Sequence, residues 1–173
     1  MPSDPETFRF ADDGAIPNNP KLPVLVYRSA FDASGDGAAE VELLFAANGW
    51  PPQWRAGIFP FHHYHSTAHE VLGIAHGQVR VRLGGERGRD FDLQAGDVVV
   101  LPAGTGHKRL SDRGDLVVVG GYPPGPSWDL LRGEPSERPM ALENSARVPL
   151  PKSDPVGGKD GPLLRLWNSA SAL

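Results

Sequence analysis

The sequence predicts an all-β sandwich or barrel with one α-helix, and three observations carry this prediction. From residue 57 onward, apolar and polar residues alternate with a period of two, which is typical of half-buried strands. The chain contains 21 Gly and 18 Pro, a content that favours short strands and tight turns over long helices. Turn-forming residues separate the apolar runs at short intervals, as in sandwiches and barrels.

Short apolar runs mark the expected strands. In the clearest case Val79, Val81 and Leu83 alternate with Arg80 and Arg82, and Gly84-Gly85 then predicts a turn. The run that ends at Leu101 is apolar throughout, which predicts a strand buried on both faces. The expected strands are 24–27, 79–83, 91–94, 98–101 and 116–119.

One segment has the spacing of a helix rather than a strand. In residues 38–48, Val41, Leu44 and Phe45 fall at positions i, i+3 and i+4, and Gly49 follows as a helix stop. We therefore expect a single peripheral helix that packs on the barrel, followed by a Pro-containing link at 50–54.

Both ends of the chain are predicted to be arms. Residues 1–22 are polar and Pro-rich, which indicates an extended segment. Residues 122–173 are rich in Pro and Gly but also carry large apolar side chains such as Trp128 and Trp167, unlike a disordered tail. We expect this second arm to lie extended over the barrel or over a neighbouring subunit.

Length and composition exclude several classes of protein. A chain of 173 residues fits a single domain, 1–173, with a real core. The formal net charge of −4, without any basic run, does not fit nucleic-acid binding. No apolar run has the length of a membrane span, and no signal peptide is visible, so we expect a cytoplasmic protein. Cysteine is absent, so a bound metal would need His, Asp or Glu ligands.

Two motifs carry candidate metal ligands. The first, within 57–77, reads Gly57-x5-His63-x-His65-x4-Glu70-x6-Gly77, and the second, within 96–107, reads Gly96-x5-Pro102-x-Gly104-x2-His107. On a strand His63 and His65 project to one face, and Glu70 starts an alternating run that can join them. Three imidazoles and one carboxylate suit one divalent ion such as Fe, Mn, Co, Ni or Zn, with coordination positions left open.

The other histidines have weaker claims to the metal. His62 and His69 each neighbour a proposed ligand, so on a strand they should face away from the ion. His76 precedes a turn glycine, and we expect it to be exposed. If the chemistry needs a general base, His62, His69 and Tyr64 are candidates that the sequence does not rank.

Two further groups of residues have ordinary interpretations. Arg80, Arg82, Arg87 and Arg89 predict a solvated strand face rather than an anion site. The four tryptophans are expected to be packing residues, one of which can line the mouth of the metal pocket. They are Trp50, Trp54, Trp128 and Trp167.

Residues 57–107 resemble the two motifs of the cupin superfamily of RmlC-like proteins. The resemblance implies a double-stranded β-helix, a jelly-roll-type antiparallel barrel, with metal bound by the residues at His63, His65, Glu70 and His107. One departure is Ser111, where the family pattern often has Asn, which is not a metal ligand. The stretches HHYHSTAHEVLG, GDVVVLPAGTGHK and GYPPGPSWDLL also resemble the YjlB-like group of bacterial single-domain cupins, over most of the chain.

The cupin resemblance implies three candidate functions. The first is a mononuclear metalloenzyme acting on a small organic molecule, a dioxygenase-type oxidoreductase. The second is a metal-assisted isomerase or lyase, and the third is a non-catalytic module that binds or senses a small molecule. Cupins often form dimers, so the resemblance also implies a homodimer, which the long arms would suit. The residues carrying catalysis beyond the ligands are not predicted.

Overall fold

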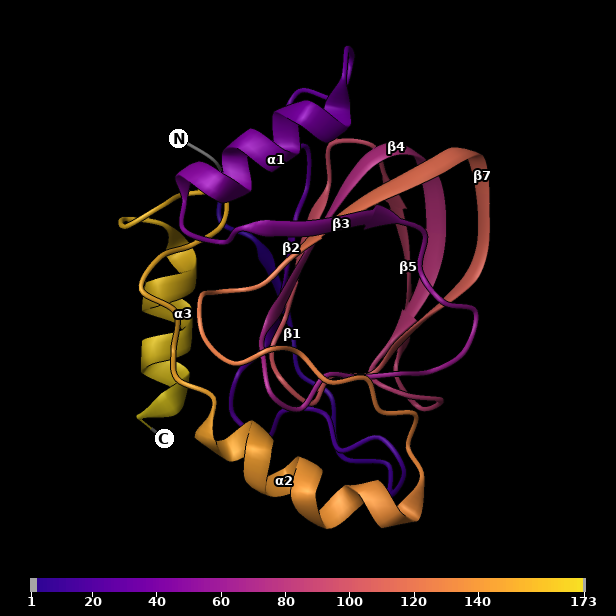
Figure 1. Cartoon of the computed structure of the whole chain (residues 1–173), viewed down its shortest axis with the longest axis vertical. Coiled ribbons are helices and arrows are strands. Elements are labelled where there is room, and N and C mark those ends of the chain that lie inside the picture. Colours follow the sequence, from indigo (N-terminus) through magenta and orange to yellow (C-terminus); the bar gives the residue numbers. More distant parts are fainter. Residues whose placement is uncertain (1–2, 173) are drawn as a thin grey trace.

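The computed structural model describes residues 3–172, in which seven antiparallel strands form one sheet curled into a half-barrel (Figure 1). The strand order is β1-β2-β6-β4-β7-β3, and β5 pairs with β4 beside this path. This confirms the predicted jelly-roll β fold. The strands are β1 (Glu6–Phe8), β2 (Val24–Tyr27), β3 (Pro52–Ala56), β4 (Glu70–Leu83), β5 (Arg89–Gln94), β6 (Val98–Leu101) and β7 (His107–Gly121).

Strand β4 organises the sheet because it pairs with β5, β6 and β7. Its alternation places Leu72, Ile74, Val79 and Val81 in one buried cluster inside the curl, as the period of two predicts. Register shifts interrupt the β4–β7 pairing around His76, and such irregularities bend and twist strands. In this antiparallel pair Leu83, at the end of β4, lies opposite His107, at the start of β7.

A second buried cluster lies on the outside of the sheet, beneath two helices. Helix α1 (Gly37–Ala47) begins after Asp36, whose carboxylate accepts a hydrogen bond from the Ala39 N–H at 3.1 Å. Its buried residues Val41 and Phe45 join this cluster, which confirms the predicted helix. Helix α3 (Pro162–Ser171) adds Trp167 to the same cluster, so both helices cover the outer face.

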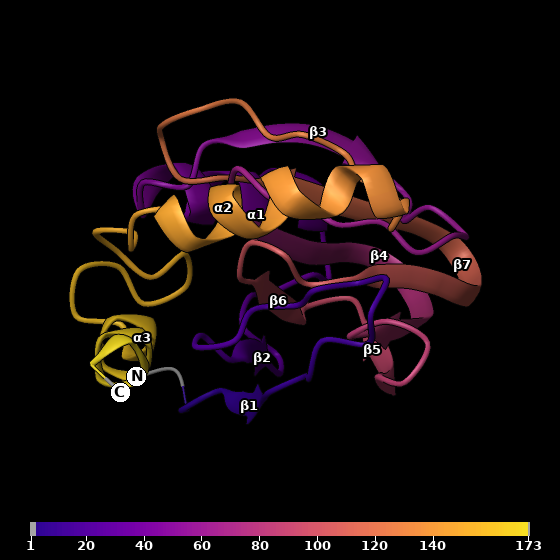
Figure 2. The same ribbon diagram turned by 90° about the horizontal axis from the view of Figure 1, so that it is seen from below.

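The prediction of one peripheral helix was wrong, because the described chain has two more. Helix α2 (Arg138–Arg147) and helix α3 (Pro162–Ser171) both lie in the C-terminal arm, with a 3-10 turn at Pro135–Glu137 before α2. The arm is therefore not simply extended, although it does lie over the barrel (Figures 1 and 2). Proline stands in the first turn of both helices, where its missing N–H costs nothing.

Two other expectations need adjustment. The predicted link at 50–54 runs into β3, an edge strand paired with β7, which accommodates Pro52 at its start. The N-terminal arm is mainly irregular, as predicted, but contributes the short β1 to the other edge of the sheet. None of the helices between residues 3 and 172 combines the length and apolar character needed to cross a membrane.

Candidate metal centre

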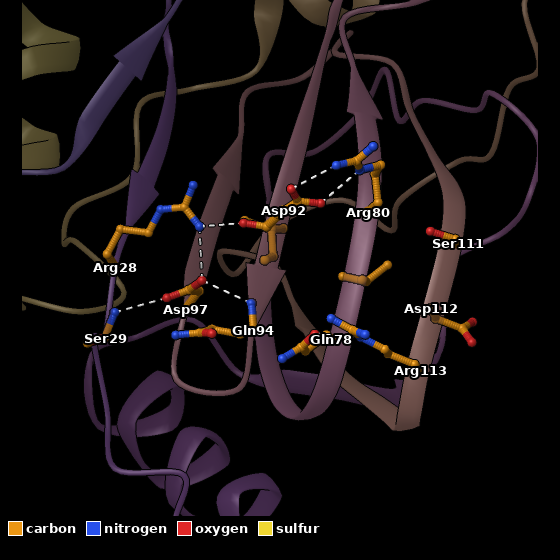
Figure 3. A pocket seen from close by; sticks show the side chains of 12 residues that line it. Arg28, Ser29, Gln78, Arg80, Asp92, Gln94, Asp97, Ser111, Asp112 and Arg113 are labelled. Carbon is orange, nitrogen blue, oxygen red and sulfur yellow. Dashed lines mark hydrogen bonds and ion pairs between the residues drawn. The ribbon is translucent and has the colours of Figure 1, made fainter.

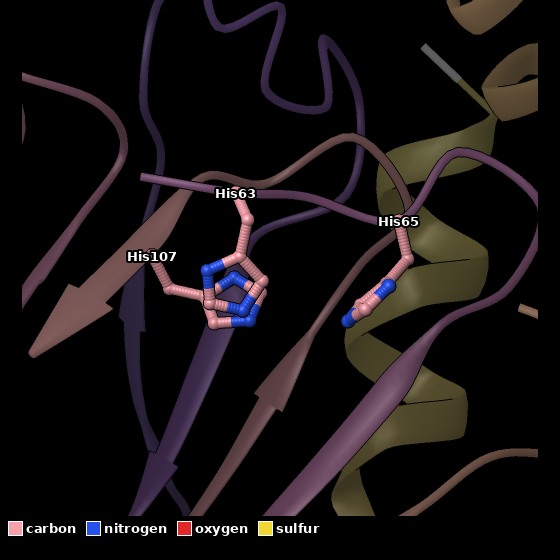
Figure 4. Close-up of side chains that lie close together, drawn as sticks. All are labelled: His63, His65 and His107. Carbon is pink, nitrogen blue, oxygen red and sulfur yellow. The ribbon is translucent and has the colours of Figure 1, made fainter. Parts of the chain in front are cut away.

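Three buried histidines meet at one end of the half-barrel (Figure 4). His63, His65 and His107 each offer a ring nitrogen, and these three atoms all lie within 4.8 Å of one another. His63 and His107 are held opposite each other by two backbone hydrogen bonds, of 3.2 and 3.0 Å. His65 lies two residues from His63 and faces the same space, as the alternation of an extended chain predicts.

The turn before β7 delivers His107 to this cluster. Gly104 has a φ of +95°, and a Cβ there would lie 2.7 Å from the carbonyl oxygen of Asn18. A side chain at this position would meet both a strained backbone and a clash, so glycine is required. The Gly104 N–H also donates to the His65 carbonyl at 2.8 Å, which ties the turn to the segment that carries the other two histidines.

Glu70 is the first residue of β4, and its carboxylate reaches between two of the imidazoles. Oε2 lies 3.1 Å from His65 Nε2, and Oε1 lies 3.2 Å from His107 Nε2. The side chain of Glu70 is 2 % exposed. Although the second contact is close, Oε1 makes no hydrogen bond of acceptable geometry among the described residues. A buried carboxylate oxygen without a donor is costly, so this atom calls for another partner.

The backbone sets the proton positions of all three histidines. Nδ1 of His63 contacts the Phe61 carbonyl at 3.1 Å, Nδ1 of His107 contacts the Thr105 carbonyl at 3.1 Å, and Nδ1 of His65 contacts the Asp129 carbonyl. A carbonyl oxygen only accepts hydrogen bonds, so each Nδ1 must carry a proton. In the neutral ring the lone pair is then on Nε2, which is the usual way a protein orients a histidine toward a metal.

The donor set fits a metal ion. Two ligand atoms at right angles, each about 2.1 Å from an ion, are about 3.0 Å apart, close to both Glu70–imidazole contacts. An ion bound here would also give the unpartnered Glu70 oxygen a counter-charge. Nitrogen and carboxylate oxygen donors without sulfur suit first-row divalent metals. The residues present therefore match the ligands that such an ion needs.

The environment of the cluster shifts the pKa values of His63 and His65 in opposite directions. Burial, reinforced by the neighbouring His107, lowers the pKa of His63 to about 3. Burial also acts against a charge on His65, but the Glu70 carboxylate outweighs it and raises the pKa of His65 to about 9. Burial would raise the pKa of Glu70, yet the adjacent His65 and His107 hold it well below its usual value. Without a metal the centre thus contains a His65–Glu70 ion pair.

Tyr122, directly after β7, is a residue of this centre that the sequence did not indicate. Its hydroxyl donates to Glu70 Oε2 at 2.5 Å and accepts from Trp54 Nε1 at 3.0 Å. Its ring stacks on Trp128, with centroids 4.2 Å apart and planes 6° from parallel. Burial and the nearby Glu70 both raise the pKa of Tyr122, so the phenol keeps its proton. Tyr122 therefore orients the carboxylate rather than accepting protons.

A cavity of about 470 Å³ adjoins the cluster. His63, His65, Glu70 and His107 form its polar end, so all four predicted ligands meet in one place. Most of its remaining wall is apolar, and two of the four tryptophans, Trp54 and Trp128, belong to it. The other lining residues are Ala56, Gly57, Ile58, Phe59, Pro60, Leu72, Arg109, Tyr122 and Leu130.

None of the three candidate general bases lines this cavity. His62 contacts Glu86 at 2.9 Å on the outer surface. His69 is buried against Trp167, and its Nδ1 accepts a hydrogen bond from the Ala103 N–H at 2.9 Å. Tyr64 points away from the two flanking histidines into a small apolar cluster. In each case the alternation of the chain directs the side chain away from the ligands, as predicted. His76 is exposed, which was also predicted.

A larger hollow, of about 750 Å³, lies on the polar outer face of the sheet (Figure 3). Its charges are already paired: Arg80 binds both carboxylate oxygens of Asp92, at 2.8 and 3.0 Å, and Arg28 lies 3.1 Å from Asp97. On the same face Arg82 pairs with Asp90. These contacts agree with the predicted solvated strand face, so this hollow has no excess charge that would attract an anion.

Comparisons with known proteins agree with the fold and the motifs. The cupin domain family matches residues 52–119. The uncharacterized protein YjlB of Bacillus subtilis (strain 168) is 41% identical over 167 residues, which cover 96% of this chain and 99% of YjlB.

Two solved structures show a more distant similarity. Acireductone dioxygenase from Bacillus anthracis, with a cadmium ion in its active centre, is 17% identical, covering 61% of this chain and 80% of its own, with a TM-score of 0.40. RmlC from Streptococcus suis, in complex with dTDP-D-xylose, is 12% identical, covering 96% of this chain and 95% of its own, with a TM-score of 0.37.

Proposed function

This chain belongs to the cupin family, in the group of the Bacillus subtilis protein YjlB, and we propose that it is a mononuclear metalloenzyme. One divalent ion, of Fe, Mn, Ni or Zn, is held by His63, His65, Glu70 and His107. The adjoining cavity holds a small organic molecule, which the enzyme oxidises with dioxygen when the ion is Fe, Mn or Ni, because Zn has no redox chemistry. The proposal is thus a dioxygenase-type oxidoreductase.

One observation carries the metal-binding part of the proposal. Glu70 is fully enclosed between two imidazoles, yet its Oε1 has no hydrogen-bond donor among the described residues. A protein that needed only a buried ion pair would satisfy both carboxylate oxygens. Three imidazoles with Nδ1 bound to carbonyls further support the proposal, because their Nε2 atoms are left for an ion.

The cavity wall favours oxidation over isomerase or lyase chemistry. A bound divalent ion supplies Lewis acidity and open coordination positions for substrate and dioxygen. Isomerisation or elimination also needs a protein base near the substrate. Outside the four ligands, the ionisable residues in the described lining are Arg109 and Tyr122, and the raised pKa of Tyr122 keeps it protonated. A reaction that requires no protein base therefore fits this wall better.

The other lining residues position the reactants. Tyr122 holds the Glu70 carboxylate through Oε2 and leaves Oε1 turned toward His107. Trp128 and Leu130 form an exposed part of the apolar wall, and a small organic molecule bound against them would keep water from the reacting groups. Two hydrogen bonds hold the segment of Trp128 and Leu130 against the residues that follow His65. The Ser66 N–H donates to the Asp129 carboxylate at 2.6 Å, and the Asp129 N–H donates to Thr67 Oγ1 at 3.0 Å.

Anaerobic reconstitution with Fe(II) tests the proposal. The loaded protein is exposed to oxygen with a panel of small organic molecules, and oxygen uptake is measured against the His63→Ala variant. We expect substrate-dependent uptake by the wild type alone. Turnover of a substrate under strict anaerobiosis, with Mn(II), Ni(II) or Zn(II), would instead favour isomerase or lyase chemistry. Stoichiometric metal with ligand binding but no turnover would leave a binding or sensing module.

A further inference from the structure

We infer that the cavity takes a small organic carboxylate, which lies between the metal centre and the guanidinium of Arg109. This inference rests on the proposed function and deepens it, because it names the chemical class of the substrate. The argument uses the position of Arg109, the charge balance of the cavity and the character of its walls.

Arg109 faces the cavity because of its place on β7. It lies two residues after His107, and residues i and i+2 of a strand share a face. In the β4–β7 register it stands opposite Val81, whose side chain belongs to the buried inner cluster. Its Nε donates to the Ile58 carbonyl at 3.0 Å, which fixes the side chain against a residue of the cavity wall. This bond holds the guanidinium against the cavity wall, although the side chain is 30% exposed.

The charge balance of the cavity favours an anion. Among the described lining residues, Arg109 carries the single permanent positive charge and Glu70 the single carboxylate. The two positive charges of a divalent ion exceed the single negative charge of Glu70. With the ion bound, the cavity therefore has a net positive charge both at the metal centre and at Arg109. Asp112 lies 3.2 Å from Arg109 Nη1, but its side chain is 39% exposed, and exposed pairs contribute little. No hydrogen bond within residues 3–172 involves Nη2 of Arg109, so this nitrogen can bind a ligand.

The walls and the size limit the kind of anion. A cavity of about 470 Å³ accepts a small molecule, and Trp54, Ile58, Phe59 and Leu130 offer it an apolar surface. A phosphate dianion would need more donors than one guanidinium supplies in such a wall. A carboxylate matches the planar guanidinium and carries one charge. The fitting ligand is therefore a monocarboxylate with an apolar body.

Matched ligand pairs test this inference on the full-length protein loaded with Mn(II). The probes are benzoate with benzamide, and hexanoate with hexanamide, and binding is measured by calorimetry. Metal content is determined on the same samples. We expect one or both carboxylates to bind at least tenfold more tightly than the matched amide, which is about 1.4 kcal/mol.

Variants of Arg109 assign the preference to this residue. Arg109→Gln should lower carboxylate affinity at least tenfold without loss of metal, since hydrogen bonds to charged groups contribute strongly. Arg109→Lys keeps the charge and should give an intermediate affinity. The matched control is Arg113→Gln on the same strand, because Arg113 donates to Gln78 on the outer face and should not affect binding.

The outcomes distinguish the two proposals. Absence of metal from the wild type would overturn both the proposed function and this inference. A metal-loaded wild type that binds no probe, that binds amides as tightly as carboxylates, or that matches Arg109→Gln would overturn this inference alone. Carboxylate selectivity that is lost in Arg109→Gln and kept in Arg113→Gln would support it.

Discussion

Replacing Tyr122 with Phe removes a single hydroxyl from the metal centre and tests how Glu70 is positioned. This hydroxyl donates to Glu70 Oε2 at 2.5 Å and accepts from Trp54 Nε1 at 3.0 Å. The phenyl ring retains the shape that stacks on Trp128. The substitution should therefore change the hydrogen bonding of the carboxylate while leaving the packing intact.

The size of the effect follows from the lost hydrogen bond. A hydrogen bond to a charged group contributes about 1.5–3 kcal/mol. Groups that orient a metal ligand typically change metal affinity by about 10–100-fold, which is about 1.4–2.7 kcal/mol. The two ranges overlap, so we expect Tyr122→Phe to bind metal about 10–100-fold more weakly than the wild type, with the fold retained.

Competitive titration with a metal-binding dye measures this affinity. The matched control is Tyr64→Phe, because Tyr64 is completely buried, its hydroxyl has no partner within the described part of the chain, and it faces away from the ligands. We expect this control to bind metal as the wild type does. Equal affinity in Tyr122→Phe and the wild type would refute the role assigned to Tyr122.

Three further perturbations concern the same centre. His65→Ala should lose the metal and, with it, the stabilisation of about 2.7 kcal/mol that a ligand at 100 times its Kd provides. The control is His76→Ala, at an exposed position, which should keep both the metal and the stability. Metal analysis and thermal unfolding measure the two effects. Because the pKa of His65 is raised to about 9 and metal needs the unprotonated ring, apparent metal affinity should rise about tenfold per pH unit from neutrality to about pH 9, then level off in a pH series. In the metal-free protein the His65–Glu70 ion pair should stabilise the fold fully below pH 6.5, and this stabilisation should be lost as the pH rises through 9. A free energy of unfolding that increases over that pH range would contradict the assignment. Gly120→Ala places a Cβ 2.1 Å from the ring of Trp54, so it should displace the donor to Tyr122 and cost about 1–3 kcal/mol in denaturant unfolding; unchanged stability would contradict this packing.

The strands and the ligands were predictable because their signals are local. The alternation of Val79, Val81 and Leu83 with arginines is visible in the local sequence alone. It predicts a strand with one buried face, and these three residues do lie in the inner cluster. His63 and His65 share a face for the same reason. The convergence of His107 on them depends on pairing between distant segments, which the spacing of the second motif suggested and the resemblance to cupins reinforced.

The missed helices had weaker or conflicting signals. Helix α2 buries only Ala141, so its sequence has no apolar stripe to detect. Helix α3 does have one, since Leu163, Trp167 and Ala170 are buried at i, i+4 and i+7, and Pro162 is a helix-start signal. The surrounding density of Pro and Gly nonetheless favoured an extended reading. For α3, the periodicity was therefore the better guide.

The additional residues of the site lie far from the motifs. Tyr122 reaches Glu70 because β7 returns beside β4, and Trp128 joins the site by stacking on Tyr122; no local pattern in the sequence predicts either contact. Arg109 was missed because the predicted strand began only at residue 116, whereas β7 begins at His107. With that start known, strand parity places Arg109 on the same face as His107.

The central claim is that His63, His65, Glu70 and His107 bind one metal ion. Elemental analysis of the protein, purified from its native host without added metal, tests this most directly, with a His63→Ala, His65→Ala double variant prepared in parallel. We predict close to one divalent ion per chain in the wild type and almost none in the variant. Equal metal content in the two proteins, or none in either, would contradict the claim.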